Sequence, residues 1–187
     1  MLNAKTMLTN ISKGQSSIPL RYLIQGLEND YMNLRNMIQI YHVTGNSGKT
    51  ILYFKVPSSS LKNFFYDCIF EFAEPITSKI TSNSNFKVYC NSPSFYFRYG
   101  NIFKRYGALL YPEKYPRLLD TPAETRNKAQ VTGFDKYVYS CLRVATQLTT
   151  QQMIDSMVSQ VPPRIPTYDE KISEYKRLKG EQEAVQD

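Results

Sequence analysis

The 187-residue chain contains few of the side chains on which most catalytic and metal centres depend. It has one histidine, His42, and three cysteines, Cys68, Cys90 and Cys141, none of them in a CxxC pair. The sequence therefore lacks the set of residues that a zinc site of the usual spacing or a histidine-based triad requires. Because the cysteines are odd in number and widely spaced, we expect buried, reduced thiols rather than a disulfide framework. The sequence favours a protein that is not an enzyme and needs no cofactor.

Long apolar runs are also absent. No window approaches the ~18 uninterrupted apolar residues of a membrane-spanning helix. The N-terminal sequence MLNAKTMLTNISKG lacks the apolar core of a signal peptide. We therefore expect no membrane partner and a protein made and kept in a cytoplasm. Tryptophan is missing, whereas 15 tyrosines are present, and tyrosine suits both core edges and contact surfaces.

Length and composition indicate one domain with appendages. The polar residues 1–16 are predicted to be a flexible arm, residues 17–161 the domain, and residues 162–187 a charged helical tail. Three prolines at 162–166 give that tail a stiff connector. The formal net charge of +7 permits contact with nucleic acid or an acidic protein surface without requiring either.

The first half of the domain shows helical and then strand patterns. Apolar residues at helical spacing predict an amphipathic helix over about 18–36. Two β-branched runs, 37–43 and 50–56, predict a hairpin around the turn at 44–49, with His42 a structural residue on the face of Ile38 and Ile40. Gly48-Lys49-Thr50 matches the last three residues of the phosphate-binding loop motif G-x-x-x-x-G-K-[ST]. That motif also requires a glycine at the position of Val43 and a helix after the threonine, and this sequence has neither pattern.

Two aromatic stretches follow the hairpin. Residues 64–72 predict a strand whose Asp67 and Glu71 share a solvated face; a helix or a pair of acid–base carboxylates is the alternative. The stretch 86–107 predicts one strand at its start and a second over 94–99, separated by a turn at Pro93. Phe95 and Phe97 would lie on the core face of that second strand, and Tyr96 and Arg98 on its outer face.

The second half of the domain is predicted to be helical. Prolines disfavour long elements over residues 108–122, where a short helix could start at Pro122. Thr132 and Asp135 resemble a short capping box that starts a helix with an apolar stripe running to Leu148. A further helix is predicted over 150–160. The fold class is therefore α+β: an antiparallel sheet of about four to six strands, an N-terminal helix and C-terminal helices packed on it, and an extended C-terminal tail.

Positive charge gathers between residues 98 and 143 and is interleaved with tyrosines. Cations beside rings suit an acidic neighbouring subunit and also suit a nucleic-acid backbone with unpaired bases. We favour the protein neighbour and keep nucleic acid as the alternative. The predicted contact residues of this region are Tyr96, Arg98, Lys104, Arg105, Tyr106 and Arg117. In the tail, Ile172, Tyr175 and Leu178 are predicted to meet a partner.

The middle of the chain resembles small virion proteins of tailed bacteriophages. The residues that carry the resemblance are NSPSFYFRY at 91–99, LLDTPAETRN at 118–127 and GFDKYVY at 133–139. It covers roughly residues 37–143 and has no motif with assigned roles. The resemblance implies a structural head–tail or tail ring component, located in the virion and assembled in the host cytoplasm. Its partners would be other virion proteins and further copies of the chain.

Overall fold

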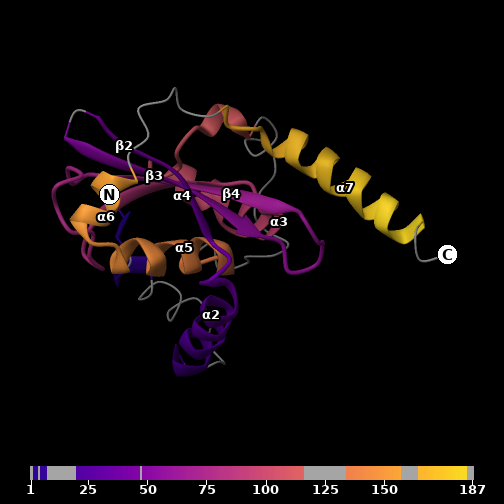
Figure 1. The fold of residues 1–187 in the computed structure, drawn as a ribbon, viewed down its shortest axis with the longest axis horizontal. Coiled ribbons are helices and arrows are strands. Elements are labelled where there is room, and N and C mark those ends of the chain that lie inside the picture. Colours follow the sequence, from indigo (N-terminus) through magenta and orange to yellow (C-terminus); the bar gives the residue numbers. More distant parts are fainter. Residues whose placement is uncertain are drawn as a thin grey trace.

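A computed structural model describes residues 2–3, 5–7, 20–46, 48–115, 134–156 and 164–184. Their centre is an antiparallel sheet (Figure 1). The order of its strands is β1-β5-β4-β3-β2. Its strands are β1 (Leu2–Asn3), β2 (Gln39–Asn46), β3 (Lys49–Pro57), β4 (Phe65–Phe72) and β5 (Asn85–Cys90). The predicted hairpin and the predicted strand over 64–72 are confirmed. Because β3 begins at Lys49, a strand and not a helix follows the phosphate-loop-like sequence.

One face of the sheet forms the core with helix α5 (Lys136–Gln147). Leu52 of β3 lies opposite Phe70 of β4, and Phe72 lies opposite Phe86 of β5, so large apolar side chains stack across three strands. Helix α5 turns its buried face toward this layer, with Val138, Cys141 and Ala145 at 0% exposure. The apolar stripe predicted for this helix is confirmed.

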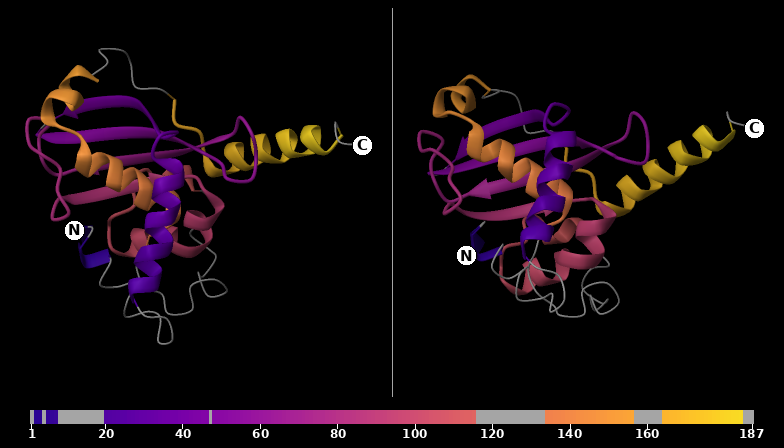
Figure 2. Two further views of the ribbon diagram at one scale, coloured as in Figure 1. Left: turned by 60° about the horizontal axis from the view of Figure 1, so that its bottom comes forward. Right: turned by 90° about the horizontal axis from the view of Figure 1, so that it is seen from below.

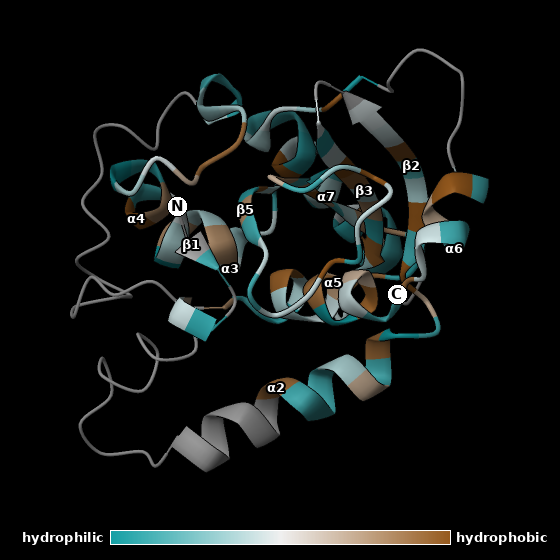
Figure 3. Cartoon of the chain, turned by 90° about the vertical axis from the view of Figure 1, so that its left-hand side faces the viewer, coloured by the Kyte–Doolittle hydropathy of each residue, from teal (hydrophilic) through white to brown (hydrophobic). Residues whose placement is uncertain are grey.

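Helix α2 (Leu20–Leu34) forms the outer layer and lies on α5 rather than directly on the strands (Figure 3). The Tyr31 hydroxyl donates to Gln147 Oε1 over 2.7 Å, and Arg143 Nε lies 3.1 Å from the Glu28 carboxylate. Sheet, α5 and α2 thus form three layers, and the predicted α+β fold with an antiparallel sheet is confirmed.

The three cysteines, far apart in sequence, lie on neighbouring core elements. Cys68 and Cys90 are opposite each other on β4 and β5, and Cys141 is on α5. All three are free and fully buried, as predicted, and burial raises the pKa of each thiol.

A β-bulge in β2 corrects the prediction for His42. Ile40 lies opposite Phe54, but His42 lies opposite Tyr53, so Tyr41 is an extra residue in the strand. An extra residue reverses the alternation of side chains, and His42 therefore faces away from Ile40. The ring is buried at 6% exposure.

Residues 93–105 are helical, so the second strand predicted over 94–99 is wrong. Helix α3 (Pro93–Phe95), the π-helical turn η1 (Tyr96–Gly100) and α4 (Asn101–Arg105) follow one another without a break. Ser92 caps the start by accepting the Phe95 amide over 3.1 Å, and Pro93 occupies the first turn. A serine followed by proline starts helices as readily as it interrupts strands, and this local signal prevailed over the alternation of rings.

Three other predicted boundaries shift. Asp135, not Thr132, is the N-cap of α5, and its carboxylate accepts a hydrogen bond from the Tyr137 amide over 2.9 Å. Thr132 and the helix predicted to start at Pro122 lie outside the described residues. The helix predicted over 150–160 is α6 (Thr150–Asp155), as far as the structure describes it. Residues 2–3 join the sheet as β1 and Met7 is buried, so the predicted flexible arm does not hold for them. A short 3-10 helix, η2 (Pro112–Lys114), precedes the undescribed stretch.

Candidate interaction site

The predicted tail contains a regular helix, α7 (Tyr168–Ala184), which extends away from the rest of the molecule (Figures 1 and 2). It begins with a reciprocal cap. The Glu170 amide donates to Thr167 Oγ1 over 3.2 Å, and the Thr167 amide donates to Glu170 Oε2 over 2.8 Å. Hydrogen bonding to the Thr167 backbone lowers the pKa of Glu170. This T-x-x-E pattern is a capping box, a sequence signal that could have located the start of the helix but was not used to predict it.

Ring contacts hold the first half of α7 on the domain. The Tyr168 ring stacks on Tyr96 with centroids 3.7 Å apart and an angle of 9° between planes. The Tyr175 ring meets Phe64 edge-on at 5.4 Å. Just before the helix, the Tyr89 hydroxyl donates to the Pro166 carbonyl. Together these contacts fix the base of α7.

Beneath the helix base lies a buried ionic network centred on Asp67, so the prediction of a solvated face is wrong for this residue. Asp67 is 0% exposed. Its Oδ1 accepts the Tyr53 hydroxyl over 2.5 Å and pairs with Lys55, and its Oδ2 accepts Asn91 Nδ2 over 2.7 Å. Burial, followed by the nearby Asp67 charge, raises the pKa of Tyr53 far above its usual range.

Lys171 of α7 brings a second cation to this network. Its Nζ lies 3.8 Å from Asp67 Oδ2, 2.9 Å from Glu174, and 4.7 Å from the centre of the Phe64 ring. The Lys171 side chain is 7% exposed. A buried lysine requires a buried counter-charge, so Lys171 and Asp67 tie the helix to β4. Lys171 was not predicted as a functional residue, because only the tertiary structure places it near Asp67.

Asp67 and Glu71 do not form a paired-carboxylate site. Glu71 pairs with Lys49 at the protein surface over 2.9 Å. Asp67 is buried and already accepts hydrogen bonds on both oxygens. The two acids therefore have separate structural roles, and the acid–base alternative gains no support from their geometry.

The predicted basic contact residues divide into three groups. Tyr96 is buried at 7% exposure under Tyr168, so its prediction as an outward-facing contact is wrong. Arg98, Lys104, Arg105 and Tyr106 are exposed on one helical segment, residues 98–106, which we call the basic segment. Arg117 lies outside the described residues. No aspartate or glutamate occurs between positions 74 and 113, so no acid neighbours the basic segment in sequence.

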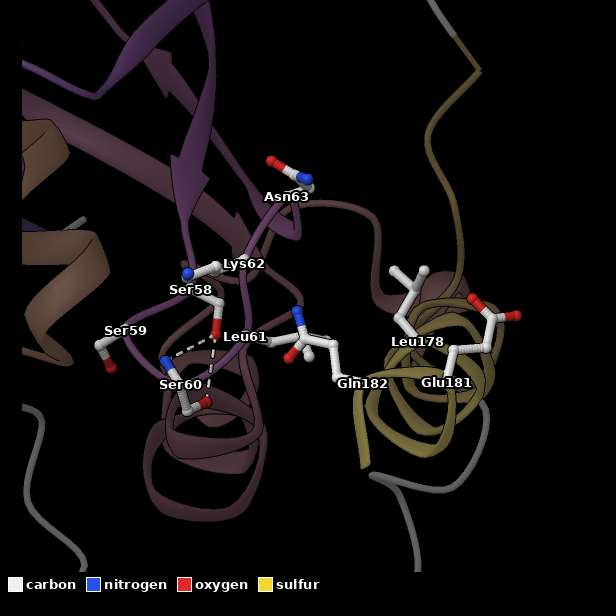
Figure 4. A pocket seen from close by; sticks show the side chains of 9 residues that line it. All are labelled: Ser58, Ser59, Ser60, Leu61, Lys62, Asn63, Leu178, Glu181 and Gln182. Atoms are coloured by element: carbon white, nitrogen blue, oxygen red, sulfur yellow. Dashed lines mark hydrogen bonds between the residues drawn. The ribbon is translucent and has the colours of Figure 1, made fainter. Parts of the chain in front are cut away.

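The predicted tail contacts Ile172, Tyr175 and Leu178 are half-buried and pack toward the domain core. Leu178 also lines a groove of about 690 Å³ between α7 and the loop at 58–63 (Figure 4). A smaller groove of about 320 Å³ lies among α2, α5 and α6. The exposed part of the tail is the second half of the helix.

Across the described ranges, no group of three or more histidine, cysteine or acidic side chains is arranged to hold a metal ion. Within those same ranges no helix is long and apolar enough to cross a membrane. Comparison with protein-family models, curated proteins and solved structures finds no match for the chain.

Proposed function

We propose that this protein is a non-enzymatic assembly subunit that contacts neighbouring proteins through α7. The observation that carries the proposal is the division of this helix into two halves. Its base is held by the Tyr168–Tyr96 stack and the Lys171–Asp67 pair, while most of residues 176–184 are exposed. A helix that is fixed at one end and exposed at the other suits presentation to a partner.

The particle to which we assign it is a tailed bacteriophage, as a head–tail or tail ring component assembled in the host cytoplasm. The resemblance of residues 37–143 to small virion proteins supports this assignment. Its partners would be other virion proteins and further copies of the chain.

The test compares the full chain with a chain that ends after Tyr175, which keeps the anchored base of α7. Both are used to capture proteins from phage-infected cells, and the captured proteins are identified by mass spectrometry. We expect capsid or tail proteins with the full chain and their loss with the shortened chain, at an unchanged unfolding midpoint. Failure of the full chain to capture any particle protein would reject the proposal.

The basic segment favours nucleic-acid binding as a second candidate function. Arg98, Lys104 and Arg105 are each exposed within this segment, and Tyr106, which follows Arg105, is 57% exposed. Cations beside an exposed ring suit a phosphate backbone and its bases. This candidate predicts binding of single-stranded DNA that weakens steeply with salt. A gel shift that retains no DNA or RNA at low salt would exclude it.

A further inference from the structure

The second half of α7, residues 176–184, is called here the distal half. Leu178 and Gln182 are half-buried, and the remaining residues are exposed. Figures 1 and 2 show it projecting beyond the sheet and the other helices. Its stability as a helix therefore depends mainly on its own sequence.

That sequence is poorly suited to an isolated helix. Gly180 lies in its interior, where glycine costs about 1 kcal/mol relative to alanine. Glu181 and Glu183 occupy the last turn, where negative charge opposes the helix dipole, and no basic residue balances them there. The ion pairs Arg177–Glu181 and Lys179–Glu183 place the cation before the acid, which is the less favourable order. A partner would supply the stability that these features remove.

The order of charges identifies what such a partner could be. Three cations, Lys176, Arg177 and Lys179, precede two acids, Glu181 and Glu183. A parallel copy of the distal half would align like charges. An antiparallel copy would set the cations of each helix against the acids of the other. The distal half is therefore electrostatically complementary to itself in the antiparallel direction.

The groove in Figure 4 gives this copy a place to lie. Leu178, Glu181 and Gln182 line one wall, and the loop, including Leu61 and Lys62, lines the other. Arg177 does not itself line the groove, but it pairs over 2.6 Å with Glu181, which does. Lys179 and Glu183 are not among the lining residues. One ion pair of the distal half thus has a member in the groove, Glu181, and the other pair has none.

We infer that the distal half of α7 pairs antiparallel with the same segment of a second copy of this chain, along the groove. Arg177 of each chain faces Glu181 of the partner subunit, so the two-fold axis passes at the level of residue 179 and the two Leu178 side chains lie on either side of it. The inference rests on the proposed function, because it names the partner of the same projecting helix. The contact is isologous and closes as a two-fold dimer.

The contact is small, and this sets the expected affinity. Two helical turns bury far less surface than the about 1,600 Å² of a standard stable interface. We therefore expect a dissociation constant in the micromolar range or weaker for the purified chain.

Sedimentation velocity over a concentration series tests the inference with two single charge reversals, Arg177→Glu and Glu181→Arg. Each variant replaces two attractive contacts per dimer by repulsive ones, so we expect each to raise the dissociation constant about tenfold. An equimolar mixture of the two variants restores opposite charges between chains, so we expect heterodimers of near wild-type affinity. Both variants lack the intrahelical pair, so recovery in the mixture arises only from contacts between chains.

Lys179→Glu is the matched control. It makes the same change of charge as Arg177→Glu on the same helix and breaks the Lys179–Glu183 pair, which has no member lining the groove. We expect its dissociation constant to stay within about twofold of wild type.

Three results would each overturn the inference: a wild-type chain that stays monomeric up to about millimolar concentration, a mixture that does not recover, or a control that weakens as much as Arg177→Glu. These results are separate from the proposed function. Capture of particle proteins by a monomeric chain would reject only the pairing, whereas a dimer that captures no particle protein would reject only the proposed function.

Discussion

Replacing Asp67 by asparagine tests whether the buried ionic network stabilises the fold and the base of α7. The substitution keeps the shape of the side chain but removes its charge. The Lys55 and Lys171 side chains, 23% and 7% exposed, would then lack their shared counter-ion. Removing one partner of a buried ion pair costs about 3–5 kcal/mol, because the other charge stays buried.

We place the loss in free energy of unfolding for Asp67→Asn at about 3 kcal/mol, the lower end of that range. Lys55 is partly exposed and can turn toward water, and Lys171 keeps its 2.9 Å pair with Glu174. Both adjustments reduce the penalty without removing it.

Glu71→Gln is the matched control on the same strand. The Glu71 carboxylate pairs with Lys49, whose side chain is 48% exposed, so its loss should cost less than about 1 kcal/mol. Equilibrium urea unfolding followed by circular dichroism measures both variants, and an unchanged slope validates the comparison. If Asp67→Asn destabilises the chain no more than Glu71→Gln, the buried network does not stabilise the fold.

Three further predictions concern buried groups. Asp135→Ala should lower the free energy of unfolding by about 2 kcal/mol through loss of the α5 cap, whereas Asp135→Asn keeps the cap and should be nearly neutral. Burial raises the pKa of Asp135, so the stability that this residue contributes to the wild-type chain falls as pH rises from about 4 through its folded pKa. In urea titrations at several pH values, Asp135→Asn should not show this loss of stability. Burial also raises the pKa of Tyr53 and Tyr89, so the free energy of unfolding should hold below about pH 10 and fall above it. Circular dichroism and tyrosinate absorbance should then change together as the pH rises. Ionisation of these tyrosines while the chain is still folded would count against the prediction. A thiol reagent added to the native chain should react only as fast as the chain unfolds, and fast labelling would contradict the burial of Cys68, Cys90 and Cys141.

The sequence correctly predicted the elements in which the spacing of apolar residues matches the face that the structure buries. The hairpin β2–β3 has β-branched runs around a glycine-rich turn, and α5 has an apolar stripe that meets the core. In both cases most of the residues that look apolar in the sequence are the ones that pack into the core. The buried cysteines followed from their residue type.

Other features depend on information that alternation alone does not carry. The rings at 94–99 alternate as a strand would, yet the Ser92 cap and a π-helical turn place Phe95 and Tyr96 on the buried side of a helix. Asp67 looked solvated because it is charged, but its cross-strand neighbour Lys55 and the distant Lys171 provide its counter-charges. A pairing between residues about a hundred positions apart requires the fold itself.

Amide hydrogen exchange along α7 in the purified chain, at a concentration where it is monomeric, tests the central claim most directly. The claim is that residues 168–175 are anchored on the domain and that the distal half is exposed for a partner. We predict slow exchange across the first half and exchange close to that of a free peptide across residues 176–184. Equal protection along the whole helix, or fast exchange at its base, would contradict the account.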